Sequence, residues 1–159
     1  MANFTAPVLV NPVSTAFKTG GAVWAGATAR RIQLYEVEFG QTGTLASTDC
    51  QNQWDLSRFG STAVMAGSTV ASNLTDPGDI ASLTLFMNAQ TAEPTYTTAG
   101  NGLSLKSWAI NQRGSYRWRA LDDGDNLLVA ATTGFGLGLR TLSSSFTASA
   151  VGNISFIER

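Results

Sequence analysis

The sequence contains no histidine and only one cysteine, Cys50, among its 159 residues. A disulfide within the chain is therefore impossible, and the side chain that most often binds metals and titrates near neutral pH is missing. Because no histidine can activate the thiol, Cys50 is predicted to be an inert, partly buried residue just before a strand. These absences argue against an enzyme, and we expect no cofactor and no bound metal.

Charged residues are also scarce. They make up 13% of the chain, against about 25% in a typical soluble domain, and the net charge is −1. Nucleic acids and anionic membranes are bound through clustered lysine and arginine, so neither is an expected partner. No run approaches the ~18 apolar residues of a membrane span, and the opening residues do not resemble a secretory signal. We expect a protein made in a cytoplasm.

What the sequence has in abundance is threonine, serine and turn-forming glycine. Threonine favours strands because its branched Cβ fits a pleated surface. Short runs follow one another at intervals of about 8 to 12 residues, a spacing typical of a β-sandwich or barrel. We therefore predict one all-β domain, a jelly-roll-like antiparallel β-sandwich. Its strands are expected at 31–39, 51–59, 96–98, 103–110, 115–121, 127–132, 137–142 and 146–157.

The first two of these strands show the clearest alternation of apolar and polar residues. In the first, Tyr35, Val37 and Phe39 are predicted to share the inward face. In the second, Trp54 and Leu56 are predicted to point inward, with the residues between them pointing outward. Both patterns indicate strands with one buried face.

Residues 1–29 show no sustained period and are interrupted by Pro7 and Pro12. Proline cannot donate a hydrogen bond to a central ladder. We therefore predict an extended N-terminal arm or edge segment over 1–29, followed by the sandwich domain over 30–159.

One short helix is expected within the otherwise all-β chain. Asp76, Pro77 and Asp79 stand in the order typical of a helix start: a capping side chain, a proline in the first turn and an acid favoured by the helix dipole. One or two helical turns are therefore predicted over 80–87.

Two groups of carboxylates are candidates for chemistry. Glu36 and Glu38 are two residues apart on one strand face, and glycosidases use paired carboxylates as acid and base. Such a pattern is more often a solvated strand face, which we favour. Asp122, Asp123 and Asp125 resemble part of a calcium loop, but the bidentate glutamate is missing, so a hairpin turn is preferred.

Residues 111–119 form the densest basic and aromatic stretch. Alternation places Tyr116 and Trp118 on one face, and Arg117 and Arg119 on the other. Binding of single-stranded nucleic acid by stacking and phosphate contact would need both kinds of side chain on one face. We therefore expect the aromatic rings in the core and the arginines in contact with solvent or with carboxylates of a neighbouring subunit.

The glycine-rich segment 133–139 superficially suggests a phosphate loop. The spacing of Gly134, Gly136 and Gly138 fits neither the dinucleotide fingerprint nor a Walker motif, and no helical pattern follows. Close packing between strands, or a bulge, is the preferred interpretation.

Five segments carry a resemblance to a known family: 31–40 (RIQLYEVEFG), 53–58 (QWDLSR), 76–79 (DPGD), 93–96 (EPTY) and 109–118 (AINQRGSYRW). Over about residues 30–157 the chain resembles small head-decoration, or cement, proteins of tailed bacteriophages, especially those of cyanobacterial and other aquatic hosts. The resemblance implies a homotrimeric β-sandwich on the outer surface of the virion. There it would bind the major capsid protein and clamp neighbouring capsid subunits.

On this hypothesis the N-terminal arm gains order by lying across an adjacent subunit. Phe4, Val8 and Phe17 of the arm, with Arg117 and Arg119, are then the candidate contacts to other subunits or to the capsid. Deleting the arm is expected to weaken capsid binding and to leave the domain folded.

Two other classes of function stay open at this point. The four tryptophans could stack on sugar rings in a virion-associated carbohydrate- or receptor-binding module, although aromatic residues are more often core. An enzyme is the third hypothesis and the least favoured, because its bases would be unassisted carboxylates.

Overall fold

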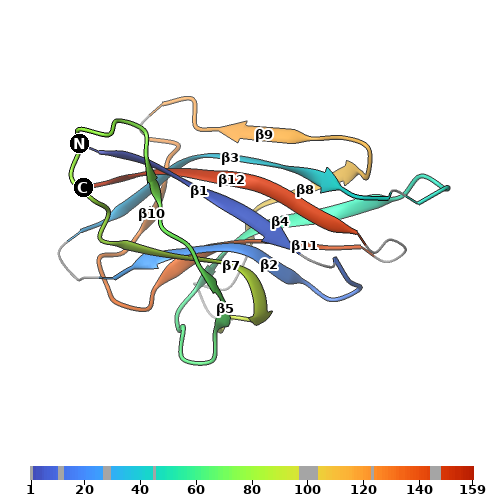
Figure 1. Cartoon of the computed structure of the whole chain (residues 1–159), viewed down its shortest axis with the longest axis horizontal. Coiled ribbons are helices and arrows are strands. Elements are labelled where there is room, and N and C mark those ends of the chain that lie inside the picture. Colours follow the sequence, from blue (N-terminus) through green and yellow to red (C-terminus); the bar gives the residue numbers. More distant parts are fainter. Residues whose placement is uncertain are drawn as a thin grey trace.

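The computed structural model describes residues 2–10, 13–26, 30–44, 46–96, 104–122, 124–143 and 148–159. Within these ranges the chain forms twelve β-strands and no helix (Figure 1). It accordingly contains no helix there that is long and apolar enough to cross a membrane. The strands are β1 (Asn3–Val10), β2 (Lys18–Ala25), β3 (Ile32–Thr42), β4 (Gln51–Phe59), β5 (Ala66–Thr69), β6 (Asn73–Leu74), β7 (Thr84–Ala92), β8 (Ser104–Asn111), β9 (Tyr116–Arg119), β10 (Leu127–Val129), β11 (Gly136–Leu142) and β12 (Ser149–Glu158).

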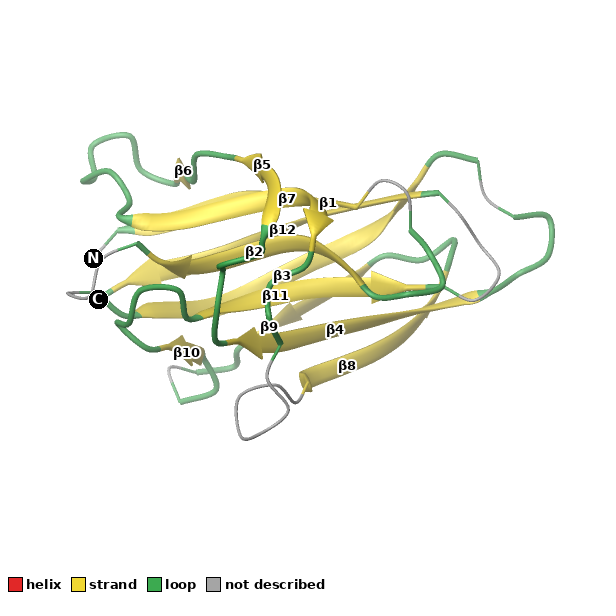
Figure 2. Cartoon of the chain, turned by 90° about the horizontal axis from the view of Figure 1, so that it is seen from below, coloured by secondary structure: helices red, strands yellow, loops and turns green. Residues whose placement is uncertain are grey.

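The strands pair into two six-stranded antiparallel sheets. Sheet A has the order β10-β3-β12-β1-β6, and β9 also pairs with β3. Sheet B has the order β5-β7-β2-β11-β4-β8. Sheet A is the upper layer in Figure 1, and Figure 2 views the molecule from below, from the side of sheet B. The predicted all-β antiparallel sandwich is therefore confirmed, and the jelly-roll connectivity stays a prediction.

The core lies between the two sheets, where the inward residues of each strand meet. Phe39 of sheet A and Trp54 of sheet B stack across this space with ring centroids 4.4 Å apart. Phe4 and Phe156 stack within sheet A at 5.5 Å. Each such aromatic side chain, when fully buried, contributes about 2–3 kcal/mol of hydrophobic stabilisation. The other large, fully buried apolar side chains include Phe86, Ile32, Leu34, Leu56, Leu137, Leu139 and Ile154.

The N-terminal segment belongs to the sandwich, so the predicted arm over 1–29 is wrong for its described residues. β1 pairs with β12 along its whole length, and β2 lies in the middle of sheet B between β7 and β11. Small residues make this close packing possible, because a Cβ on Gly21 would lie 2.8 Å from the Val8 side chain. For β1, the alternative prediction of an edge strand was closer to the structure, because its neighbour β6 pairs only with Phe4 and Thr5. Pro7 is therefore tolerated.

The predicted helix over 80–87 is also wrong. The carboxylate of Asp76 accepts a hydrogen bond from the Gly78 N–H at 2.9 Å, and the Asp79 N–H donates to the Asp76 carbonyl at 3.1 Å. These bonds close a turn, and Thr84 begins strand β7. Aspartate and proline are common in turns as well as at helix starts, and the pairing of β7 with β2 and β5 decides the outcome.

A β-bulge changes the alternation of β3. Ser155 pairs with Glu36 and Phe156 pairs with Leu34, so Tyr35 is left without a partner on β12. Val37 and Phe39 point into the core as predicted, but Tyr35 leaves their face and is only half-buried. The prediction for Tyr35 is therefore wrong, because an extra residue shifts the period of two.

The other expected strands agree closely with those observed. β4 has the predicted bounds, and β8 to β12 lie within two or three residues of theirs, except that 103 and 144–147 lie outside the described residues. Of the run 96–98 only Tyr96 is described, next to an isolated bridge between Ser61 and Thr95. The close packing predicted for the glycines is confirmed for Gly136 and Gly138, since a Cβ there would collide with the ring of Phe59 or with the hydroxyl of Tyr96. Gly134 is not closely packed and has a positive φ of 86°.

Both chain ends lie at the same end of the sandwich, which we call the terminal end (Figure 1, where N and C are marked). Asn3 pairs with Ile157, and Ile32 pairs with Glu158. In sheet B the same end holds the last residues of β2 and β4 and the first residues of β7 and β11. Residues far apart in the sequence are therefore gathered there.

Candidate functional site

The two arginines expected to meet solvent or another subunit have acidic partners in their own chain. Arg117 bonds to Glu36 at 2.7 Å and to Glu38 at 3.1 Å, and Arg119 lies 3.8 Å from Glu36. Pairing of β9 with β3 brings them together, and the hydrogen bond to Glu36 raises the pKa of Arg117. Glu36 and Glu38 are thus a charge-paired face. Trp118 packs against the core as predicted, but Tyr116, although its ring contacts Phe39, is 39% exposed, so the predicted core position is wrong for Tyr116.

Two other predicted contact residues are unsuitable for contact with a partner. Phe4 and Val8 are 0% and 2% exposed, in the core between the sheets, so this prediction is wrong for both. Alternation places them inward because their segment is a strand and not an arm. Phe17 is half-buried, and its ring lies 4.3 Å from the Arg140 guanidinium.

The acidic segment forms a turn, but the preferred interpretation as a hairpin turn is wrong, because the flanking strands β9 and β10 both pair with β3. The carboxylate of Asp122 accepts hydrogen bonds from the N–H groups of Gly124 and Asp125, at 2.7 and 3.2 Å, which closes the turn. Asp123 lies outside the described residues. No group of three or more cysteine, aspartate or glutamate side chains that could hold a metal ion occurs in the described part of the chain.

The outer face of sheet B carries a buried polar network around Arg140. The Arg140 guanidinium is stacked between the rings of Phe17 and Tyr96, at 4.3 and 4.4 Å. The Tyr96 hydroxyl lies 2.7 Å from that of Thr19, which also bonds to the Glu93 carboxylate. Burial raises the pKa of Tyr96 well above its usual value, so its hydroxyl stays protonated.

Asp55 anchors the neighbouring part of this network. It points to the outer face of β4, as alternation predicted, but it is 3% exposed. Its carboxylate accepts hydrogen bonds from Ser104 at 2.7 Å and from Ser107 at 2.6 Å, and lies 3.6 Å from Arg140. These contacts join β4, β8 and β11, so we interpret the network as structural.

Exposed apolar side chains gather at the terminal end. Eight large apolar side chains are exposed among the residues described, and five of them are found there. Leu85 pairs with Trp24 at the end of β2, and Leu128 pairs with Gln33 at the start of β3. Leu121 borders a shallow hollow with Asn3 and Ile157. The five are Ile80, Leu83, Leu85, Leu121 and Leu128.

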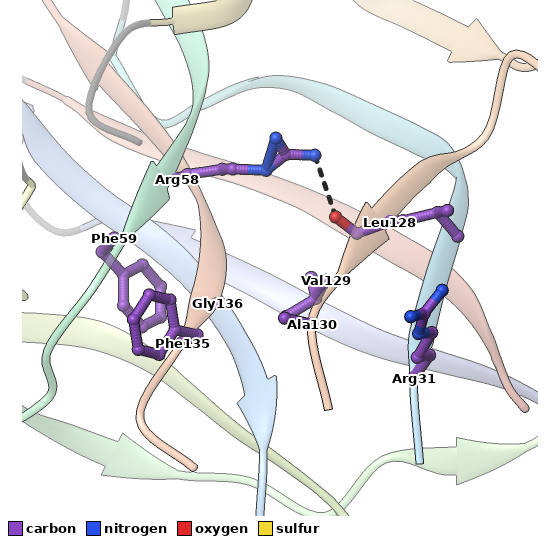
Figure 3. Close-up of a pocket in the computed structure, with 8 residues that line it drawn as sticks. All are labelled: Arg31, Arg58, Phe59, Leu128, Val129, Ala130, Phe135 and Gly136. Atoms are coloured by element: carbon purple, nitrogen blue, oxygen red, sulfur yellow. Dashed lines mark hydrogen bonds between the residues drawn. The ribbon is translucent and has the colours of Figure 1, made fainter. Parts of the chain in front are cut away.

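A cleft of about 380 Å³ opens at the same end, between β10 of sheet A and the ends of β4 and β11 of sheet B (Figure 3). Arg58 projects from β4 toward β10 and donates a hydrogen bond to the Leu128 carbonyl at 2.9 Å. Arg31 borders the cleft from the start of β3. The remaining lining is apolar, from Phe59, Leu128, Val129, Ala130, Phe135 and Gly136. We call this feature the arginine cleft.

Two of the four tryptophans are buried and the other two are half-buried. Trp54 is fully buried and Trp24 is 8% exposed. Lys106 lies over the ring of Trp118, 5.5 Å from its centre. Trp108 packs against Phe39 and Tyr116. The interpretation of the tryptophans as mainly core residues fits these contacts.

Comparisons with models of protein families, with curated proteins and with solved structures found no match to the chain. The arginine cleft and the apolar terminal end are the features that sequence reasoning missed. Arg31 and Arg58 lie at opposite ends of two strands that belong to different sheets. No sequence spacing relates them, because their proximity depends on the order in which the strands pair.

Proposed function

We propose that the chain is a structural protein that decorates the outer surface of a bacteriophage head and stabilises contacts between major capsid subunits. The observation that carries this proposal is the concentration of exposed apolar side chains at the terminal end. Exposed apolar surface of this kind is typical of protein-binding sites. We infer that the partner is the capsid from the resemblance of residues 30–157 to cement proteins.

The distribution of charge supports the same proposal. Arg30, Arg113, Arg117, Arg119 and Arg140 each have an acidic partner within the chain. The surface therefore offers little net charge for long-range attraction, and binding would depend on shape and apolar contact. A cement protein suits such modest contacts, because repetition over a capsid lattice multiplies weak binding into avidity.

We further propose that the protein acts as a homotrimer, the state that the cement resemblance implies. Three copies around a threefold position would engage three capsid surfaces at once. Phe4 and Val8 are buried, so other residues must form the contacts between copies.

The proposal is tested by light scattering of the purified protein, followed by co-sedimentation with undecorated phage heads. We expect a stable small oligomer that saturates the heads at a fixed stoichiometry. The variant Ile80→Ser/Leu121→Ser removes two of the most exposed apolar side chains of the terminal end, which are 72% and 94% exposed. It should bind the heads at least about tenfold more weakly, as expected for central interface residues.

Val64→Ser is the matched control, because Val64 is 63% exposed and is not among the five side chains of the terminal end. Heads should bind this variant as they bind the wild type. A monomer that fails to sediment with heads would overturn the proposal. Equal losses in the control and in the terminal-end variant would show that the terminal end is not the contact.

A further inference from the structure

The arginine cleft combines two cations with an apolar floor. Of the residues that the structure describes, Arg31 and Arg58 are the charged ones that line it. Arg58 is half-buried, and one of its N–H groups donates a hydrogen bond to the Leu128 carbonyl. Arg31 is exposed. A guanidinium carries five N–H donors, so several remain for a ligand.

These two arginines also differ from five other arginines of the chain, each of which has an acidic side chain as its partner. No aspartate or glutamate side chain lies within ion-pair distance of the Arg31 or Arg58 guanidinium among the residues that the structure describes, whereas five other arginines are each paired. The chain contains more acidic than basic residues, 11 against 10, so acids are available to pair with. Two unpaired arginines at one cleft therefore form a local positive site in a nearly neutral protein.

We propose that the arginine cleft binds an acidic side chain, together with an adjacent apolar side chain, on the surface of the protein to which the terminal end docks. This inference rests on the proposed function. The guanidinium group matches a carboxylate in shape and charge, and it is more weakly hydrated than an ammonium group. Apolar neighbours exclude water from the contact and so strengthen its charge-assisted hydrogen bonds. Leu128, Ala130 and Phe135 provide that apolar surface, and the buried side chains of Phe59 and Val129 lie behind it.

The size and charge of the cleft favour this occupant over a polyanion. A volume of about 380 Å³ accommodates one or two side chains and not a folded element. Nucleic acids require several phosphate contacts from clustered cations, and only two arginines are present here. Exposed Leu128 at the rim provides further apolar contact for the same partner segment.

Direct binding is measured by NMR titration of the full chain, following the side-chain Nε–Hε signals of Arg31 and Arg58. The probe is the capped dipeptide acetyl-Leu-Glu-amide, and the uncharged control is acetyl-Leu-Gln-amide. The glutamate probe should bind at least about tenfold more tightly, because it alone brings a negative charge and can form an ion pair with the guanidinium groups. Equal binding of the two peptides would overturn the inference.

Inorganic phosphate serves as a second probe. If phosphate shifts the same signals at concentrations as low as those of the glutamate peptide, the cleft is a general anion site and the assignment to an acidic side chain is wrong. We expect phosphate to bind more weakly, since it gains nothing from the apolar floor.

Substitutions of the two arginines, compared with a control outside the cleft, distinguish the loss of a positive charge from a general effect on folding. Arg31→Gln should reduce binding of the glutamate probe at least about fivefold, and Arg58→Lys should retain more binding than Arg58→Gln. Arg113→Gln is the matched control, because Arg113 is exposed and is paired with Asp49 in a turn outside the cleft. A loss with Arg113→Gln equal to that with Arg31→Gln would contradict the assignment.

Co-sedimentation with undecorated heads distinguishes failure of this inference from failure of the proposed function. If wild-type protein binds heads and Arg31→Gln/Arg58→Gln binds equally well, the function stands and the inference fails. If the glutamate probe binds as expected but no variant binds heads, the cleft stands as an acidic-peptide site and its assignment to the capsid fails.

Discussion

Glu158, the last residue of β12, accepts a hydrogen bond from the backbone N–H of Thr84 at 2.8 Å. This contact connects the final strand of sheet A to the first residue of β7 in sheet B. The same carboxylate bonds to the Ser82 hydroxyl and, at 2.8 Å, to the Arg30 guanidinium. One buried side chain thus fixes three segments of the terminal end, beside the exposed Leu83 and Leu85.

Replacing Glu158 by Gln should therefore destabilise the fold. The amide keeps the size of the side chain, but it loses the charge-assisted bonds and places an NH₂ group near N–H donors. We expect the free energy of unfolding to fall by about 1–3 kcal/mol in urea titrations. Asp49→Asn is the control, because the Asp49–Arg113 pair is exposed and should contribute less than about 1 kcal/mol. A control loss as large as that of Glu158→Gln would contradict this account.

The stabilisation from Glu158 should depend on pH. Burial raises the pKa of this carboxyl, but hydrogen bonds from Ser82, Thr84 and Arg30 outweigh burial and leave the pKa below its usual value. A depressed carboxyl pKa stabilises the fold above the unfolded-state pKa, about 4.3, and the effect is lost as pH falls through the folded-state pKa. The stability difference between wild type and Glu158→Gln should therefore be constant near pH 7 and shrink below about pH 4. A difference that grows in acid would refute the assignment.

Gly138 should not tolerate a side chain while Tyr96 keeps its hydroxyl. A Cβ on Gly138 would overlap the Tyr96 hydroxyl, which bonds to Thr19. Gly138→Ala is expected to cost about 1–3 kcal/mol of stability through overpacking. Tyr96→Phe removes the obstructing oxygen, so the double variant should be at least about 1 kcal/mol more stable than the sum of the single effects predicts. Strictly additive losses in urea unfolding would show that the two residues do not collide.

Deleting residues 2–10 should unfold the protein. The sequence-based expectation was that the domain would stay folded without its N-terminus. β1 instead supplies the buried side chains of Phe4 and Val8 and covers one edge of β12. Loss of Phe4 alone is expected to cost about 3–5 kcal/mol, a large share of the 5–15 kcal/mol typical of a domain. Circular dichroism and thermal unfolding should show no cooperative transition, and a transition close to that of the wild type would restore the arm hypothesis.

The sequence was sufficient for the fold class and for most strands. Alternation is a local property, so Trp54 and Leu56 could be assigned to the core, and Tyr116 and Trp118 to the face opposite the arginines, from neighbouring residues alone. The paired charges of Glu36 and Arg117 could not be assigned in this way. Their residues are far apart in the chain, and only the β3–β9 pairing brings them within 2.7 Å.

The incorrect predictions share a physical cause. Prolines and small residues in 1–29, and Asp76 with Pro77, have local preferences that are compatible with more than one structure. Long-range pairing then selected the strand, with β1 against β12 and β7 against β2. Tyr35 illustrates the same limit, because a bulge is defined by the residues of the partner strand.

By itself, the sequence determined an all-β domain with little charge, no histidine chemistry and alternating strands, since composition and period are properties of the chain. The order of strands in the two sheets was decided only by tertiary structure. That order brings Arg31, the residue before β3, and Arg58 of β4 to one cleft. It also places Glu158 beside Thr84. Such contacts depend on which strand edges and apolar faces together bury the core, and that is a property of the whole fold and not of any segment.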